Sequence, residues 1–402
     1  MVLALLETHE LQRPLLNDAG SRESMKIESI VVREIHMRLK SPFETSFGTV
    51  QDRRILLIEA VADGVSGWGE VTAGETPGYN AETTDTAWHI ISNFVGPLLP
   101  GKFLAGASEF PDLVGHIRGH EMAKSGVENA LWDAEAKLAG LPLSGLLGGA
   151  KQEINCGVSL GIRENPRSLV ARVEQELRRG YQRIKLKIKP GKDYDFVKAV
   201  RREFPKILLS VDANSAYRLN DAGHLAAFDD FDLLMMEQPL DWDDIYAHAK
   251  LQPLIKSPIC LDECIHNTRH ALAAIELNAC RVINIKIGRV GGHTEARLLQ
   301  KVCKDRGIPV WCGGMLESGI GRTHNIAVST LPGFTLPGDV SASNRYWDED
   351  IIEPEVEVST NGTIRVPAAP GIGYRVRRDR VEALTVRSQT FSTKRQASVL
   401  TT

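Results

Sequence analysis

Long hydrophobic runs are missing from this sequence. No apolar stretch approaches the ~18 residues that a membrane-spanning helix requires. The short apolar segment 2–6 lacks a basic flank and is followed by Glu7 and His9, so it is a poor signal peptide. These two absences predict a cytoplasmic protein.

The sequence also lacks paired cysteines and a strong excess of charge. None of the six cysteines forms a CxxC pair, which argues against a zinc knuckle or a redox dithiol. We expect reduced, buried and inert thiols, because free cysteine packs as a small hydrophobic residue. The net charge is −3 and no basic stretch occurs, so we expect no nucleic-acid or membrane partner.

Length and composition indicate a globular protein of two domains. The 402 residues exceed the size at which a single hydrophobic core usually stops growing. Residues 1–25 are polar and interrupted by Pro14, which predicts an N-terminal extension, and the Ser/Thr-rich residues 386–402 predict a flexible tail. Between about 26 and 150, strand-like segments are followed by helical ones, as in a separate α+β domain.

Two local patterns support that first domain. A turn at Asp63-Gly64 separates two strand-like runs, as in a hairpin. Residues 125–134 have the apolar spacing of an amphipathic helix.

From about residue 153 the pattern changes, and short apolar runs alternate with amphipathic segments. Near-continuous apolar strands that alternate with helices predict a parallel sheet buried on both faces. About eight such units predict a closed (β/α) barrel. The strand candidates are 154–160, 183–188, 207–211, 233–236, 259–261, 282–287, 309–312 and, more weakly, 334–336; helix candidates include 166–179, 194–203 and 294–306.

Five of these strands carry a charged residue at or near their end that a purely structural strand would not need. The series is Lys187, Asp212, Glu237, Asp262 and Lys286, and its successive members are 25, 25, 25 and 24 residues apart. One βα unit of a barrel of ~250 residues has about this length. Since the C-terminal rim of such barrels holds the active site, the five side chains should converge there.

Three converging carboxylates repel one another and therefore need a cation. Asp212, Glu237 and Asp262 offer only oxygen ligands, which suit a hard ion such as Mg²⁺ or Mn²⁺. The alternative is that each acid merely caps a following helix. Their matched positions beside lysines favour the metal site.

The lysines at the strand ends are candidate bases. Lys185 and Lys187 are two residues apart in a strand, so their side chains point to the same face. Two neighbouring ammonium groups and burial both favour the neutral amine, which can act as a general base. Lys286 would face Lys187 across the barrel mouth. The alternative is that Lys185 and Lys187 snorkel on an edge strand.

A metal ion between two opposed lysines suits one kind of reaction. The proton α to a carboxylate is weakly acidic, and its removal becomes feasible when a cation binds the resulting enediolate. The residues therefore predict an enzyme that removes a proton next to a carboxylate.

The motifs resemble a known family. Lys185-x-Lys187, Asp212, Glu237, Asp262 and Lys286 match the muconate-lactonizing subgroup of the enolase superfamily over roughly residues 26–385. Segments 42–48, 312–322 and 337–343 resemble the mobile lid, the loop after strand seven and the end of strand eight in the o-succinylbenzoate synthase / N-succinylamino acid racemase branch.

This resemblance implies a domain plan. The fold would be a (β/α)7β TIM-like barrel at 151–339, with an α+β capping domain at 26–150 that is completed by 340–385. The Gly-rich segment 288–292 would be the turn after strand six.

The resemblance also implies roles for individual residues. Asp212, Glu237 and Asp262 would bind Mg²⁺, for which Mn²⁺ could substitute. Lys187 would remove the α-proton and then protonate the departing hydroxide, and Lys286 would stabilise the enediolate by its charge. In racemization the two lysines would act on opposite faces of the α-carbon.

Supporting and substrate-binding roles follow from the same resemblance. Asn214 and Glu263 would support a metal ligand and Lys286. The substrate would contact the lid residues Phe43, Ser46 and Phe47, and the loop residues Gly314, Met315, Leu316, Glu317 and Ser318.

Several functions remain open at this point. The first is o-succinylbenzoate synthase, a carbon–oxygen lyase of menaquinone biosynthesis that dehydrates a succinyl-hydroxycyclohexadiene carboxylate, with or without racemase activity. The alternatives are a dedicated N-succinylamino acid racemase, a muconate-type cycloisomerase, and a non-catalytic barrel that kept its metal site. In each catalytic case we expect a small-molecule carboxylate as substrate, and we expect a homo-oligomer.

Overall fold

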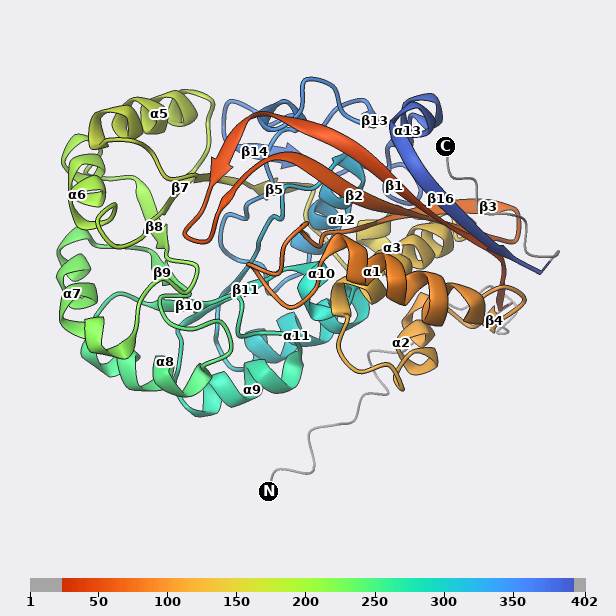
Figure 1. Ribbon diagram of the computed structural model, residues 1–402, viewed down its shortest axis with the longest axis horizontal. Coiled ribbons are helices and arrows are strands. Elements are labelled where there is room, and N and C mark those ends of the chain that lie inside the picture. Colours follow the sequence, from red (N-terminus) through yellow and green to blue (C-terminus); the bar gives the residue numbers. More distant parts are fainter. Residues whose placement is uncertain (1–23, 394–402) are drawn as a thin grey trace.

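The computed structural model describes residues 24–393 (Figure 1). Residues 1–23 of the predicted N-terminal extension and the last part of the predicted tail therefore lie outside the described residues. Figure 1 shows two parts, a ring of short strands and helices and, beside it, a group of long strands with its own helices.

Long antiparallel strands form the core of the capping domain. The strands lie in the order β16-β1-β2-β3, and a short strand β4 pairs with β1. Their bounds are β1 Met25–Glu44, β2 Thr49–Ala62, β3 Val65–Val71, β4 Phe103–Leu104 and β16 Thr385–Ser392. Asp63 and Gly64 both have positive φ, at 44° and 77°, and turn β2 into β3. This confirms the predicted hairpin, since such turns favour Asp-Gly.

Strand β16 corrects the prediction of a flexible tail from residue 386. It pairs antiparallel with β1, with Ile30 opposite Phe391. Phe391 is buried, and Arg387 forms an ion pair with Glu34 of β1 at 2.6 Å. The Ser/Thr composition was misleading because β-branched residues such as Thr385 and Val386 also favour strands.

Helix α3, Glu121–Leu138, packs against this sheet and is buried on nearly all sides. An added Cβ at Gly69 would lie 2.1 Å from the Gly126 carbonyl oxygen, so glycine permits the close approach of strand and helix. The predicted helix at 125–134 is confirmed, but it has no solvent face there, because both the sheet and the barrel cover it. The other helices of this region are α1 Thr84–Ile90, α2 Phe110–Leu113 and α4 Leu143–Leu147.

Seven parallel strands form the barrel sheet, in the order β12-β11-β10-β9-β8-β7-β6. Their bounds are β6 Gly157–Leu160, β7 Arg183–Lys187, β8 Leu208–Asp212, β9 Met235–Glu237, β10 Ile259–Leu261, β11 Val282–Ile285 and β12 Val310–Cys312. Bridges Val310↔Phe334 and Cys156↔Gly338 connect both edges to one further segment, which closes the ring. The predicted TIM-like barrel with a capping domain is confirmed.

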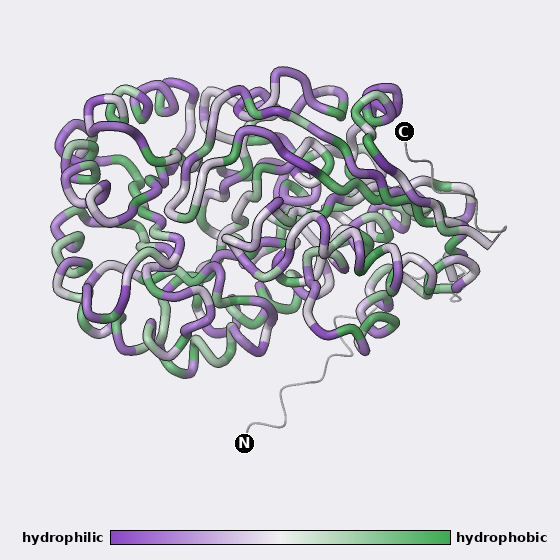
Figure 2. The backbone as a smooth tube through the Cα atoms, in the orientation of Figure 1, coloured by the Kyte–Doolittle hydropathy of each residue, from purple (hydrophilic) through white to green (hydrophobic). Residues whose placement is uncertain are grey.

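Helices cover the outside of the barrel. They are α5 Pro166–Arg178, α6 Tyr194–Glu203, α7 Ala222–Ala226, α8 Ile245–Leu251, α9 Thr268–Glu276, α10 Ile287–Val290, α11 His293–Asp305 and α12 Gly319–Ser329. In Figure 2 the outer helices alternate between hydrophilic and hydrophobic colours, as helices with one buried face do. The predicted turn at 288–292 is largely the short helix α10, and only Gly291 and Gly292 have positive φ.

Smaller strands connect distant parts of the chain. β5 Glu153–Asn155 pairs with β14 Thr363–Arg365, and β13 Ile352–Glu353 pairs with β15 Arg375–Val376. Helix α13, Arg378–Leu384, leads into β16. Through these strands and α13, the chain returns from the barrel to the capping domain. The exact boundaries between the two domains stay a prediction.

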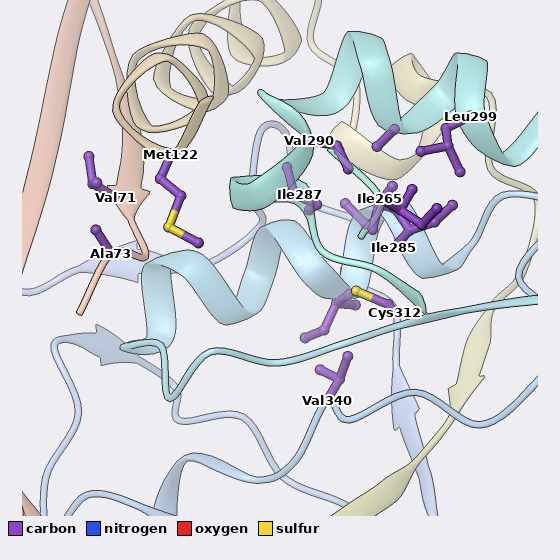
Figure 3. Close-up of a cluster of buried hydrophobic side chains, with 14 of the residues drawn as sticks. Val71, Ala73, Met122, Ile265, Ile285, Ile287, Val290, Leu299, Cys312 and Val340 are labelled. Carbon is purple, nitrogen blue, oxygen red and sulfur yellow. The ribbon is translucent and has the colours of Figure 1, made fainter. Parts of the chain in front are cut away.

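One hydrophobic core joins the two parts. Figure 3 shows Val71, Ala73 and Met122 of the capping domain close to Ile287 and Val290 of the barrel side. All six cysteines are buried and free, as predicted. Burial raises the pKa of Cys303 to about 12, which keeps its thiol protonated. Over residues 24–393, we find no helix with the length and apolarity needed to span a membrane.

Candidate active site

A cavity lies between the capping domain and the mouth of the barrel. From the barrel it is lined by Lys185, Lys187, Lys286 and Asn214, among others. The capping domain contributes Phe43, Phe47, Val50, Arg53 and Tyr79 among its walls. The predicted loop residues Gly314, Met315 and Leu316 also line it.

Three predicted substrate contacts have other partners. Ser46 Oγ donates to the Asn214 carbonyl at 2.9 Å, which fastens the lid to the barrel. Glu317 accepts from the Met315 amide at 2.7 Å and so holds its own loop. Ser318 donates to Glu70 of the capping domain at 2.5 Å.

Strand register brings the predicted charges to one rim. Lys187 pairs with Asp212, and Asp212 pairs with Glu237, on three successive parallel strands. Glu237 pairs with Cys260, so Asp262 follows two residues later on the next strand. Lys286 follows directly after β11. The repeat of 25 residues in the sequence therefore becomes a set of neighbours in space.

Each lysine pairs with an acid. Lys187 Nζ lies 2.6 Å from Asp212 Oδ2, and Lys286 Nζ lies 2.7 Å from Asp262 Oδ2. Lys185 Nζ lies 2.7 Å from Glu237 and 3.2 Å from Asp212. Lys185 thus bridges two of the predicted metal ligands, a role that the sequence did not indicate.

The carboxylates have unequal proton affinities. Burial and the neighbouring Asp212 raise the pKa of Glu237 to about 7, although Lys185 opposes this. Burial also acts on Asp212, but Lys187 and Lys185 outweigh it and lower its pKa to about 2. A cation shared by these oxygens would remove the repulsion that raises the pKa of Glu237.

Among residues 24–393, no group of three or more His, Cys, Asp or Glu side chains is arranged to hold a metal ion. The acids instead direct oxygens toward the ammonium groups. The donor set nevertheless fits a hard cation, because three buried carboxylates lie at or just after the ends of adjacent strands and Glu263 Oε2 has no hydrogen-bond partner.

Lys286 has a more crowded environment than Lys187. Tyr79 places its ring 4.3 Å from Lys286 Nζ and donates to Asp262 at 3.2 Å. Arg289, which is fully buried, forms an ion pair with Asp262 and donates to Tyr79 Oη at 2.9 Å. Burial opposes the charge of Lys286, but Asp262 and other acids outweigh it and raise its pKa.

Sequence reasoning missed Arg289 and Asp339. Arg289 lies three residues after Lys286, and a cation in a Gly-rich apolar segment was the available signal. Asp339 accepts from Lys185 at 2.8 Å and also pairs with the buried Arg183. Its position at the expected end of strand eight could have pointed to it.

Asn214 and Glu263 were expected to support a metal ligand and Lys286. In the structure their hydrogen bonds lead to Lys187 instead. Asn214 Oδ1 accepts from Lys187 at 2.5 Å, and Asn214 Nδ2 donates to Glu263 at 2.8 Å. Asn214 therefore connects Glu263 to Lys187, and no hydrogen bond joins Glu263 to Lys286 in the described part of the chain.

Comparisons with known proteins agree with this geometry. Residues 26–148 match the N-terminal domain model of mandelate racemase / muconate lactonizing enzyme, and residues 168–380 match the enolase C-terminal domain-like model. An o-succinylbenzoate synthase from Geobacillus kaustophilus is 53% identical over 369 residues, which are 92% of this chain and 98% of that protein.

Two further relatives have different descriptions. An N-succinylamino acid racemase from Amycolatopsis is 45% identical over 350 residues, 87% of this chain and 95% of that protein. The crystal structure of an enolase-superfamily member from Listeria innocua superimposes with a TM-score of 0.88 and 40% identity, covering 92% of this chain and 99% of the other.

Proposed function

Starting from the fact that this chain belongs to the enolase superfamily, in its o-succinylbenzoate synthase / N-succinylamino acid racemase branch, we propose that it dehydrates a succinyl-hydroxycyclohexadiene carboxylate to o-succinylbenzoate. The product would serve menaquinone biosynthesis. The observation that carries this proposal is the pair Lys187 and Lys286, which line one cavity from β7 and from the end of β11. In the ring these strands are four apart, so the amines approach from opposite sides.

Members of the superfamily generally use a divalent metal ion. Here Asp212, Glu237 and Asp262 would hold it, and we favour Mg²⁺ because all three ligands are hard oxygens. Bound there, the ion would supply positive charge for the substrate carboxylate and the developing enediolate. The three acids would then exchange contacts with ammonium groups for contacts with the ion.

The residues of the chain divide the remaining work. Lys187, as a neutral amine, removes the α-proton, and the electron pair of the broken C–H bond moves into the enediolate. Lys286, as an ammonium, stabilises this negative charge. Lys187 then returns its proton to the departing hydroxyl group, so water leaves from the face that lost the proton.

A second candidate is racemization of N-succinylamino acids. Both amines line the cavity, so one can remove the α-proton from either face while the other returns a proton to the opposite face. The relatives include proteins with each name, at 53% and 45% identity. The same site therefore supports both reactions.

A side-by-side rate comparison tests the proposal. The enzyme is assayed with Mg²⁺ for dehydration, by the absorbance of the aromatic product, and for racemization of N-succinylamino acids, by polarimetry. Dehydration at the higher kcat/KM supports the synthase as the main activity. Higher kcat/KM for racemization makes the racemase the main activity, and absence of both reactions refutes the proposal.

A further inference from the structure

Arg53 is a buried cation with weak partners in the wall of the substrate cavity. It lies on β2 of the capping domain, is 4% exposed and lines the cavity. Its Nη1 lies 3.5 Å from Glu75 Oε1, its Nη2 lies 3.4 Å from the Ala73 carbonyl, and its Nε has no hydrogen-bond partner. A guanidinium has five N–H donors, and burying it without good partners is unfavourable.

The neighbouring residue on the same strand shows what a satisfied arginine looks like. Arg54 points to the other face and lies 2.7 Å from both Glu34 and Asp85. The Arg54 backbone N–H also donates to Glu75 Oε1 at 2.7 Å. The oxygen nearest Arg53 is therefore already held by a shorter hydrogen bond, and Arg53 has room for a better acceptor.

The other cations of the cavity have carboxylate partners at shorter distances than Arg53 has. Lys185, Lys187 and Lys286 each have a carboxylate oxygen within 2.8 Å. They lie on the barrel side, whereas Arg53 lies on the capping side. Apolar side chains of Phe43, Phe47, Val50, Met315 and Leu316 line the same cavity.

This distribution of charge fits a ligand with two carboxylates. One carboxylate belongs at the barrel rim, where the lysines and the proposed ion lie. An apolar middle part would contact the aromatic and aliphatic walls. The second carboxylate would then reach the capping domain, where Arg53 can donate two parallel hydrogen bonds to it.

We propose that Arg53 binds the distal carboxylate of the succinyl group and thereby selects succinylated substrates over other acyl compounds. This proposal rests on the proposed function, since both candidate substrates carry that group. Arg53 binds away from the reacting carbon, so it should affect substrate binding far more than the chemical step.

Paired substrates test this inference. One is an N-succinylamino acid, and the other is its N-succinamoyl analogue, in which a neutral amide replaces the distal carboxylate with the same shape. Exchange of the α-proton in D₂O is followed by NMR for wild type, Arg53→Gln and Arg53→Lys. Arg54→Gln is the matched control, because it removes a guanidinium from the same strand on the opposite face.

We expect wild type to prefer the succinyl compound. Arg53→Gln should raise KM for that compound about 10- to 100-fold, as expected for loss of a charge-assisted hydrogen bond, and change KM for the amide less than about threefold. Arg53→Lys should restore part of the preference, and Arg54→Gln should keep all of it. In Arg53→Gln, kcat should stay close to that of wild type.

The outcomes separate the two proposals. If wild type exchanges neither compound and does not dehydrate the succinyl-hydroxycyclohexadiene carboxylate, the proposed function fails; if it only dehydrates, KM for dehydration replaces KM for exchange in the comparison of Arg53→Gln with Arg54→Gln. If wild type exchanges both compounds equally well, or if Arg53→Gln changes both KM values equally, the role of Arg53 is overturned while the function stands. If Arg53→Gln does not fold, Arg53→Lys decides: a reduced preference for the succinyl compound supports the role of Arg53, and an unchanged preference overturns it.

Discussion

The two sheets of the molecule handle charge in opposite ways. Along β1, buried and exposed residues alternate, because one face of the antiparallel sheet contacts solvent. On its solvent side, Arg38 of β1 pairs at 2.7 Å with Asp52 of β2, and both side chains are exposed. The barrel strand β11 is buried at every position. Lys286, just after it, therefore finds its partner inside the protein.

This contrast in solvent exposure indicates where proton transfer can occur. Surface ion pairs are screened by water and contribute little. At the barrel rim, the same groups are desolvated, so each contact changes proton affinity and each charge acts strongly on a bound substrate. The barrel rim therefore suits proton transfer better than the solvent face of the capping sheet does.

The two domains meet through buried carboxylates at helix starts. Glu70 of β3 accepts from the Gly321 amide at 2.9 Å at the start of α12. Glu128 of α3 accepts from the Thr294 amide at 3.2 Å at the start of α11. Helix N-termini favour negative charge, so these contacts fasten the cap onto the barrel.

The largest effects should come from the barrel lysines. Lys187→Ala should lower kcat for dehydration about 10²- to 10⁴-fold, because it removes the base. For N-succinylamino acids in D₂O, Lys187→Ala should lose α-proton exchange from one enantiomer and Lys286→Ala from the other. NMR of each pure enantiomer measures this. Exchange unchanged in both variants would refute the two-base assignment, and the exposed Lys198→Ala is a control.

Binding of the proposed Mg²⁺ ion should depend on the carboxylates at the barrel rim. Treatment with a chelator should abolish turnover, and added Mg²⁺ should restore it. Glu237→Gln should weaken Mg²⁺ binding by more than about tenfold, since even outer partners of metal ligands contribute that much. Titration calorimetry measures the affinity. The control is Glu203→Gln, which changes an exposed carboxylate at the end of α6. Wild-type affinity in Glu237→Gln would remove this residue from the ligand set.

A smaller, pH-dependent effect should come from the contact between domains. Burial raises the pKa of Glu70 from 4.5 to about 7. Between these values the folded protein holds a proton that the unfolded chain has lost, so stability falls as pH rises through this window and is then constant. The difference amounts to roughly 3 kcal/mol at most.

Glu70→Gln should remove this contribution. At pH 5 the variant should melt at a lower temperature than wild type, because its amide offers one acceptor oxygen where the Glu70 carboxyl has two. At pH 8 the difference in melting temperature should be smaller, because wild type then has a buried charged carboxylate and the variant does not. Differential scanning calorimetry at both pH values measures it, with the exposed Glu28→Gln as control. A gap that widens from pH 5 to pH 8 would contradict the assigned shift.

The smallest effect should come from the lid. Ser46→Ala removes the hydrogen bond from Ser46 Oγ to the Asn214 carbonyl. One such bond contributes about 0.5–1.5 kcal/mol, so KM should rise roughly 2- to 10-fold with little change in kcat. Steady-state kinetics measures this, and the exposed Thr49→Ala should behave as wild type. A large fall in kcat instead would place Ser46 in the chemical step.

The sequence predicted the barrel well because its signal is local. Strand β10 and helix α6 have the predicted bounds, Ile259–Leu261 and Tyr194–Glu203. Prediction failed where distant segments decide the structure. Strand β16 pairs with residues of β1 that lie 350 or more positions earlier in the chain, and α3 is buried on nearly all sides because two domains cover it.

For the site, the spacing of charged residues along the chain was enough to predict which groups reach the barrel rim. A repeat of 25 residues fixes one βα unit, and parallel strands in register carry Lys187, Asp212 and Glu237 to the same level. The contacts between groups, such as that of Lys185 with Asp339, and the position of Arg53 in the cavity wall follow from the packing of the whole molecule. The physical reason is that local periodicity fixes the direction of a side chain, whereas its partners depend on the packing of segments that are remote in the chain.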